Sequence, residues 1–151
     1  MAMFVEAVRL GAIEDPGQAA MWFSTAVGIL VMYFAKLRPG ELLELARGCV
    51  SLPSGLIASL EKRQAATLAL RDPKNSRAMG RLQCAVVDDK VAVRWLEWLC
   101  GSLALQVKLF MITASTLRKA FKKLTVRLHL ESLGLTPASL RAGRATDLFT
   151  G

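Results

Sequence analysis

One uncharged apolar run, Pro16–Ala35, constrains the fold of this chain more than any other feature. The run, PGQAAMWFSTAVGILVMYFA, is long enough to cross a bilayer, and Lys36 and Arg38 follow it directly. A helix buried on all sides at the centre of a domain has the same composition. Polar residues and glycines dilute the run and no second apolar run follows, so we favour the buried helix. Asp15 is expected to cap its start.

Length and composition favour one globular domain. A chain of 151 residues can bury a stable core, and a hydrophobic fraction of 53% excludes a disordered chain. The three cysteines, Cys49, Cys84 and Cys100, form no C-x-x-C pair, so we expect free thiols in a reducing compartment. The N-terminal residues lack the pattern of a secretory signal peptide. An intracellular protein is therefore expected.

The positive charge is unevenly distributed. The formal net charge is +8, from 20 basic and 12 acidic residues. Residues 1–35 hold only one of the basic residues, Arg9, and three acids, which leaves 20 − 1 = 19 basic and 12 − 3 = 9 acidic residues in the remainder. A basic body of this kind favours a polyanionic partner.

Much of this charge lies on one predicted helix, which Ser115 is expected to cap. Its apolar residues follow the 3.6-residue period, and its cations have no compensating acid before Glu131. Such a face is either simply solvated, or bound phosphate groups reduce the repulsion between its like charges. The apolar stripe is Leu117, Phe121, Leu124 and Leu128, and the cations are Arg118, Lys119, Lys122, Lys123 and Arg127.

The other predicted elements are short. Residues Met1–Ala12 form an amphipathic helix, and a helix that begins at Pro39 ends near Gly48. Asp88 caps a helix that runs to Cys100, with Val91, Trp95, Leu96, Trp98 and Leu99 mostly facing inward. Four strands are expected, at Val50–Leu52, Leu56–Leu60, Thr67–Leu70 and Leu82–Val87.

The C-terminal stretch Leu135–Gly151, LTPASLRAGRATDLFTG, begins with a helix signal and then places an arginine on the inner face. Thr136 is a good N-cap and Pro137 suits the first helical position. Arg141 lies on the apolar stripe of that helix. Because a guanidinium keeps its charge, one that points inward requires an anion. That anion is either a carboxylate of the protein or a bound ligand, and the stretch alone favours neither.

This stretch resembles the second conserved box of the tyrosine recombinases, the DNA integrase family, which reads roughly T-P-H-S-L-R-H-x-x-A-T. Ala138 stands where the family has a catalytic histidine. The segment KLRPGELLEL resembles the first box, L-R-x-x-E-L-L-x-L, which places Arg38 at the first catalytic arginine and Glu41 as its helix partner. Lys74 matches the lysine that the family carries on a hairpin. The second box is matched by Thr136, Pro137, Ser139, Leu140, Arg141, Ala145 and Thr146.

The resemblance implies the fold and the chemistry of a recombinase catalytic core. The expected fold is α+β, mainly α, with a small antiparallel sheet, in a single domain that is C-terminally incomplete. Arg38 and Arg141 would stabilise the charge on a phosphodiester and Lys74 would act as general acid toward the leaving 5′-oxygen, with no metal or other cofactor.

The resemblance also implies a nucleophilic tyrosine downstream of Arg141, and the sole tyrosine, Tyr33, cannot take that role. We therefore expect an inactive, DNA-binding, recombinase-like domain from a mobile element. Its partner would be duplex DNA, on which it can form homo-oligomers, in the nucleus of a eukaryote or in the nucleoid. The expected DNA contacts are Arg71, Arg77, Arg81, Arg118, Lys119, Lys122, Lys123 and Arg144.

Overall fold

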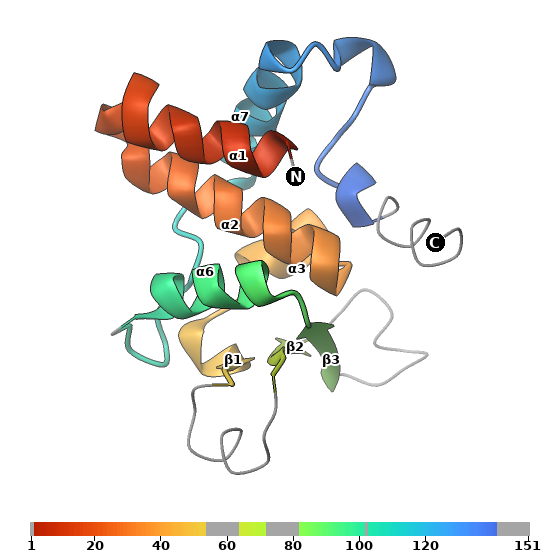
Figure 1. The fold of residues 1–151 in the computed structure, drawn as a ribbon. Coiled ribbons are helices and arrows are strands. Elements are labelled where there is room, and N and C mark those ends of the chain that lie inside the picture. Colours follow the sequence, from red (N-terminus) through yellow and green to blue (C-terminus); the bar gives the residue numbers. More distant parts are fainter. Residues whose placement is uncertain (1, 54–63, 72–81, 102, 142–151) are drawn as a thin grey trace.

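A computed structural model describes residues 2–53, 64–71, 82–101 and 103–141 and shows a mainly helical α+β fold with one three-stranded antiparallel sheet (Figure 1). Short helical turns connect several of the longer elements, and residues 139–141 are again helical. The helices are α1 (Ala2–Arg9), α2 (Ala19–Ala35), α3 (Pro39–Leu43), α6 (Lys90–Cys100) and α7 (Ala114–Arg127), and the strands are β1 (Val50–Ser51), β2 (Ala66–Arg71) and β3 (Leu82–Val87). The coarse prediction of an α+β, mainly α fold is confirmed.

Helix α2 is the centre of the core. Every residue from 25 to 32 is buried, and α1, α3, α6, α7 and β3 all contact the helix. Figure 1 shows α1 and α6 on opposite sides of α2. The segment Pro16–Ala35 is also long and apolar enough to cross a membrane, by length and composition. In this structure half of its most apolar stretch is buried inside the protein, including every residue from 25 to 32, as expected of a core helix that is apolar all round.

Asp15 does not cap α2, contrary to the prediction. A π-helical turn, Leu10–Glu14, and a 3₁₀ turn, Pro16–Gln18, precede the helix, so that α2 begins only at Ala19. The Asp15 carboxylate instead accepts a hydrogen bond of 3.1 Å from the indole Nε1 of Trp22. Because Trp22 is buried, its N–H needs such a partner.

The predicted caps of α6 and α7 are each displaced along the chain. Asp89, rather than Asp88, caps α6, and its carboxylate accepts a hydrogen bond of 2.9 Å from the amide of Ala92. Thr113, rather than Ser115, caps α7, and its hydroxyl accepts from the amide of Thr116 at 3.1 Å. In both cases a neighbour with equivalent capping chemistry takes the position.

Two residues of α6 that were predicted to face inward face solvent. Trp98 is 57% exposed and Val91 is 46% exposed. The inner face of the helix consists of smaller residues together with Leu96, and Trp95 is only partly buried. The buried residues of α6 are Ala92, Val93, Leu96 and Cys100.

The sheet has the order β1-β2-β3, and β3 is an edge strand. Leu68 of β2 pairs with Val50 of β1 on one side and with Ala85 of β3 on the other. The predicted strand Thr67–Leu70 lies within β2, and the predicted strand Leu82–Val87 coincides with β3. The predicted strand Leu56–Leu60 lies outside the described residues.

A glycine in α2 allows α3 to pack closely. A Cβ atom at Gly28 would lie 3.0 Å from Cδ2 of Leu42, so a larger residue would push α3 away from α2. Helix α3 ends at Leu43 and not near Gly48 as predicted, because the chain then pairs with a distant segment. The amide of Gly48 donates to the carbonyl of Leu105 at 2.8 Å, and the amide of Leu109 donates to the carbonyl of Leu45 at 3.0 Å.

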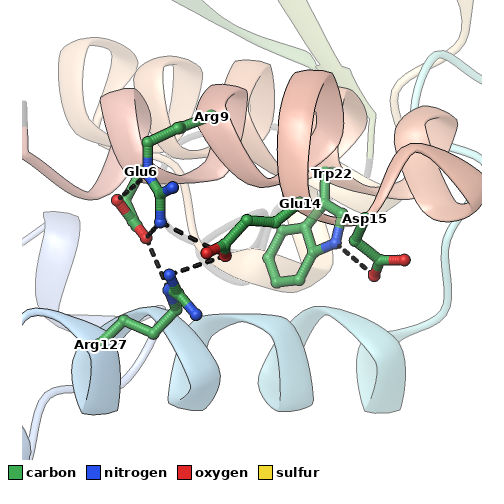
Figure 2. A network of polar contacts seen from close by, with 6 residues as sticks. All are labelled: Glu6, Arg9, Glu14, Asp15, Trp22 and Arg127. Atoms are coloured by element: carbon green, nitrogen blue, oxygen red, sulfur yellow. Dashed lines mark hydrogen bonds and ion pairs between the residues drawn. The ribbon is translucent and has the colours of Figure 1, made fainter.

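An ion-pair network joins α7 to the N-terminal helix (Figure 2). The Glu6 carboxylate accepts hydrogen bonds from Arg9 at 2.7 Å and from Arg127 at 2.6 Å. Arg127 also pairs with Glu14 at 2.7 Å. For Arg127 neither a solvated face nor phosphate is therefore needed, because acids from the N-terminal part of the chain compensate its charge. Hydrogen bonds from Arg9 and Arg127 lower the pKa of Glu6 from 4.5 to about 2.

Acid should weaken the fold through Glu6. Because the pKa of its carboxyl is lower in the folded state, Glu6 stabilises the fold above pH 4.5, and this contribution is lost as the pH falls toward 2. Glu6→Gln should lower the free energy of unfolding at pH 7 by about 1 kcal/mol, a value discounted for solvent exposure. It should also reduce the acid dependence, as measured by urea denaturation between pH 7 and pH 2.

Glu44→Gln is the control for this measurement. Glu44 is exposed and pairs with Lys108 only at 3.7 Å, so its removal should leave the stability almost unchanged. Equal acid dependence of Glu6→Gln and the wild type would contradict the assignment.

Candidate anion-binding site

A cavity of about 400 Å³ opens where the C-terminal end of α2, the start of α3, strand β3 and the helical residues 139–141 meet. The lining is partly apolar and partly charged. Apolar residues of α2 and β3 lie beside charged residues from the neighbouring segments. The lining residues are Phe34, Ala35, Lys36, Leu37, Arg38, Glu41, Leu70, Gln83, Cys84, Ala85, Val86, Asp88 and Arg141.

Arg38 and Arg141 both line this cavity, although they lie far apart in the sequence. Both residues are half-buried. Within the described part of the chain, no carboxylate oxygen lies within 4.0 Å of either guanidinium, since every ion pair found there joins other residues. Of the two anions that the sequence allowed for Arg141, a carboxylate of the protein is therefore not found among these residues. Both arginines therefore line a space that an anionic ligand can enter.

The start of α3 holds Arg38 in place. Arg38 is extended, with φ −79° and ψ 153°, and Pro39 follows at the first helical position. The amide of Arg38 donates a hydrogen bond of 3.0 Å to Oε2 of Glu41. Glu41 therefore contacts Arg38 as expected, but through the backbone. This bond uses the backbone amide of Arg38, and Arg38 is also one of the residues that line the cavity.

A turn at residues 136–139 holds Arg141 in place. The amide of Thr136 donates to Oγ of Ser139 at 3.0 Å, and the amide of Ser139 donates to the carbonyl of Thr136 at 2.9 Å. Pro137 is buried and Leu140 packs against the core. The chain does turn into a helix here, but the helical residues begin at Ser139, after a turn at residues 137 and 138, and not at Pro137 as predicted. The continuation of this helix after Arg141 lies outside the described residues.

Two further lining residues were missed by the sequence analysis. Lys36 is exposed and directly follows α2, with φ 58° and ψ 40°, the left-handed conformation. Its position at the end of the apolar run, two residues before Arg38, could have indicated that Lys36 lies near the same site. Gln83 is half-buried, and its Nε2 is buried without a hydrogen-bond partner among the described residues. No sequence pattern indicated Gln83.

Several predicted contacts lie elsewhere. Lys123 of α7 places its Nζ 5.5 Å from the centre of the Trp22 ring, a cation–π arrangement. Arg118 and Lys122 line a separate cavity of about 350 Å³ beside residues 134–137. The side chain of Arg71 in β2 is not described. Lys74, Arg77, Arg81, Arg144, Ala145 and Thr146 lie outside the described residues.

Comparisons with protein-family models, with curated proteins and with solved structures find no match to this chain. Within the described residues, no group of three or more His, Cys, Asp or Glu side chains could hold a metal ion. The geometry of the cavity is therefore the main observation on which a function can be argued.

Removal of the unpartnered Gln83 amide should stabilise the free protein. A buried donor without a partner costs roughly 1–3 kcal/mol, and an apolar Leu side chain carries no such donor. Gln83→Leu should raise the free energy of unfolding by about 1 kcal/mol in urea denaturation. Gln106→Leu, at an exposed position, should change it by less than about 0.5 kcal/mol. A lower stability of Gln83→Leu would show that the amide has a structural partner.

Proposed function

We propose that this chain is a DNA-binding domain of the tyrosine recombinase (integrase) type, associated with DNA recombination and integration, and that these 151 residues bind the phosphodiester backbone but do not cut it by themselves. The observation that carries the proposal is the placement of Arg38 and Arg141 in one cavity, without a carboxylate partner in the described residues. These are the two residues at which the two sequence boxes match the catalytic arginines of that family.

Phosphate binding accounts for this pair of charges. Two guanidiniums can each direct two N–H groups at the non-bridging oxygens of a phosphodiester, in a planar geometry that matches those oxygens. In a recombinase the same contacts stabilise the charge that builds up during strand cleavage. The mainly helical fold with a small antiparallel sheet agrees with the proposal.

Strand cleavage is not part of the proposal. The 151 residues contain one tyrosine, Tyr33, which lies on α2 and is not among the lining residues of the cavity. Ala138, at the position of the family's catalytic histidine, is exposed and carries no group that could hydrogen-bond or transfer a proton. Binding of duplex DNA is the activity that the cavity supports.

The two arginines should determine the salt dependence of DNA binding. The wild type should bind duplex DNA without sequence preference, and the logarithm of its affinity should fall linearly with the logarithm of the salt concentration. Arg38→Gln and Arg141→Gln should each make this slope shallower by about 0.9, measured by fluorescence anisotropy with a labelled duplex.

Arg94→Gln provides the matched control, because Arg94 is exposed on α6 and does not line the cavity. Its slope and affinity should equal those of the wild type. A wild type that does not bind DNA, or that binds it independently of salt, would refute the proposal. Equal effects of all three substitutions would show that binding is not centred on the cavity.

A second candidate is a single-span membrane protein with a basic cytoplasmic tail. It is favoured by one observation, the helical segment Pro16–Ala35, which is long and apolar enough to cross a membrane. Burial of residues 25–32 by the surrounding elements argues against it.

Fractionation of cells that express the chain separates the two candidates. The DNA-binding proposal predicts that carbonate at high pH releases the protein completely from the membrane pellet. Retention in the pellet after this extraction would establish the membrane candidate instead.

A further inference from the structure

We propose that Lys36 is the third cation that binds the phosphate group in this cavity, and that the chain keeps a lysine in a left-handed conformation for that purpose. The inference rests on the proposed function and extends it to a residue outside both sequence boxes. It is argued from the backbone conformation of Lys36, from its place in the cavity and from the charge balance of the lining.

The backbone of Lys36 adopts a conformation that favours glycine. Its φ of 58° and ψ of 40° lie in the left-handed region, where a side chain is strained. Helices commonly end in this conformation with a glycine. The cap itself is made by the backbone, since the amides of Lys36 and Leu37 both donate to the carbonyl of Met32. The lysine side chain is therefore not needed to end α2.

The cavity gives this lysine a function. Lys36 lines the same space as Arg38 and Arg141, and within the described residues it forms no ion pair. A lysine at a helix C-terminus also interacts favourably with the helix dipole, but that effect requires no cavity and no neighbouring arginines. Strained residues that survive in a fold tend to lie at binding sites.

The charge balance of the lining depends on Lys36. The cavity is lined by three cations, Lys36, Arg38 and Arg141, and by two acids, Glu41 and Asp88. Without Lys36 the formal charges would cancel, because two cations would face two acids. With Lys36 the excess is one positive charge, which matches the single negative charge of a phosphodiester. Lys36 is exposed, so it can reach a phosphate at the mouth of the cavity.

The chain contains a matched control for the backbone effect. Among the described residues, only Lys36 and His129 have a positive φ without being glycine, and the φ of His129 is 57°. His129 is also exposed and follows a helix, α7, but it does not line this cavity. Replacement of either residue by glycine relieves the same backbone strain. Only the replacement at Lys36 removes a charge from the cavity.

The test compares Lys36→Gly, Lys36→Arg and His129→Gly with the wild type, using the full chain and a labelled DNA duplex. Both glycine variants should raise Tm by about 2 °C. Lys36→Gly should bind about eightfold more weakly at 0.1 M salt, with a salt slope shallower by about 0.9. His129→Gly should bind as the wild type does, and Lys36→Arg should keep both the affinity and the slope.

Each outcome decides between specific alternatives. If Lys36→Gly binds with unchanged affinity and slope while Arg38→Gln weakens binding, the role of Lys36 is refuted and the proposed function stands. If Lys36→Gly loses stability together with affinity, the lysine has a structural role and the inference is also refuted. If the wild type does not bind duplex DNA, the proposed function fails and the inference fails with it. Greater stability combined with weaker, less salt-dependent binding supports the inference.

Discussion

Burial of α2 on every side is the constraint on which the rest of the structure depends. Its residues 25–32 leave no face for solvent, so α1, α3, α6, α7 and β3 must all supply apolar cover. This stretch carries no charged side chain, and the hydroxyl of its polar residue, Thr25, is buried and donates to the carbonyl of Met21 at 2.8 Å. Charged residues appear only where it ends, at Lys36 and Arg38, and the cavity lies at that end. The packing of the core thereby determines where a polar site can form.

The structure divides the basic residues into two groups. Arg9 and Arg127 are neutralised by Glu6 and Glu14, and this network fastens the N-terminal helix to α7 (Figure 2). The cations of the cavity have no such acids within ion-pair distance in the described residues. A high net charge alone indicates only a general affinity for polyanions. The cavity is one place on the surface where cations without an acidic partner in the described residues lie close together.

Two departures from ordinary protein chemistry occur at the same cavity. Lys36 has a left-handed backbone where a glycine would be favoured, and Gln83 buries an amide nitrogen that has no partner in the described part of the chain. Each lowers the stability of the free protein. Natural chains keep such features mainly at sites that bind a ligand. Their coincidence with Arg38 and Arg141 supports the choice of this cavity as the functional site, independently of the resemblance to the recombinases.

Local patterns in the sequence were sufficient for most of the elements. The apolar run predicted α2, the β-branched residues at 82–87 predicted β3, and the 3.6-residue period predicted the inner face of α7. Such patterns depend on neighbours within a few residues, and a sequence displays these directly. The caps shifted from Asp88 to Asp89 and from Ser115 to Thr113, because adjacent residues can cap equally well.

Only the tertiary structure decided which distant residues meet. It paired Arg127 with Glu6, exposed Trp98, and brought Arg38 and Arg141 to one cavity beside Lys36 and Gln83. These outcomes depend on how the helices pack around α2, and no short stretch of sequence encodes that packing. The resemblance to two recombinase boxes pointed to the arginines. The sequence by itself therefore determined the elements and the two candidate arginines. Packing decided that these arginines share one site, because ion pairs and cavities form between surfaces and not along the chain.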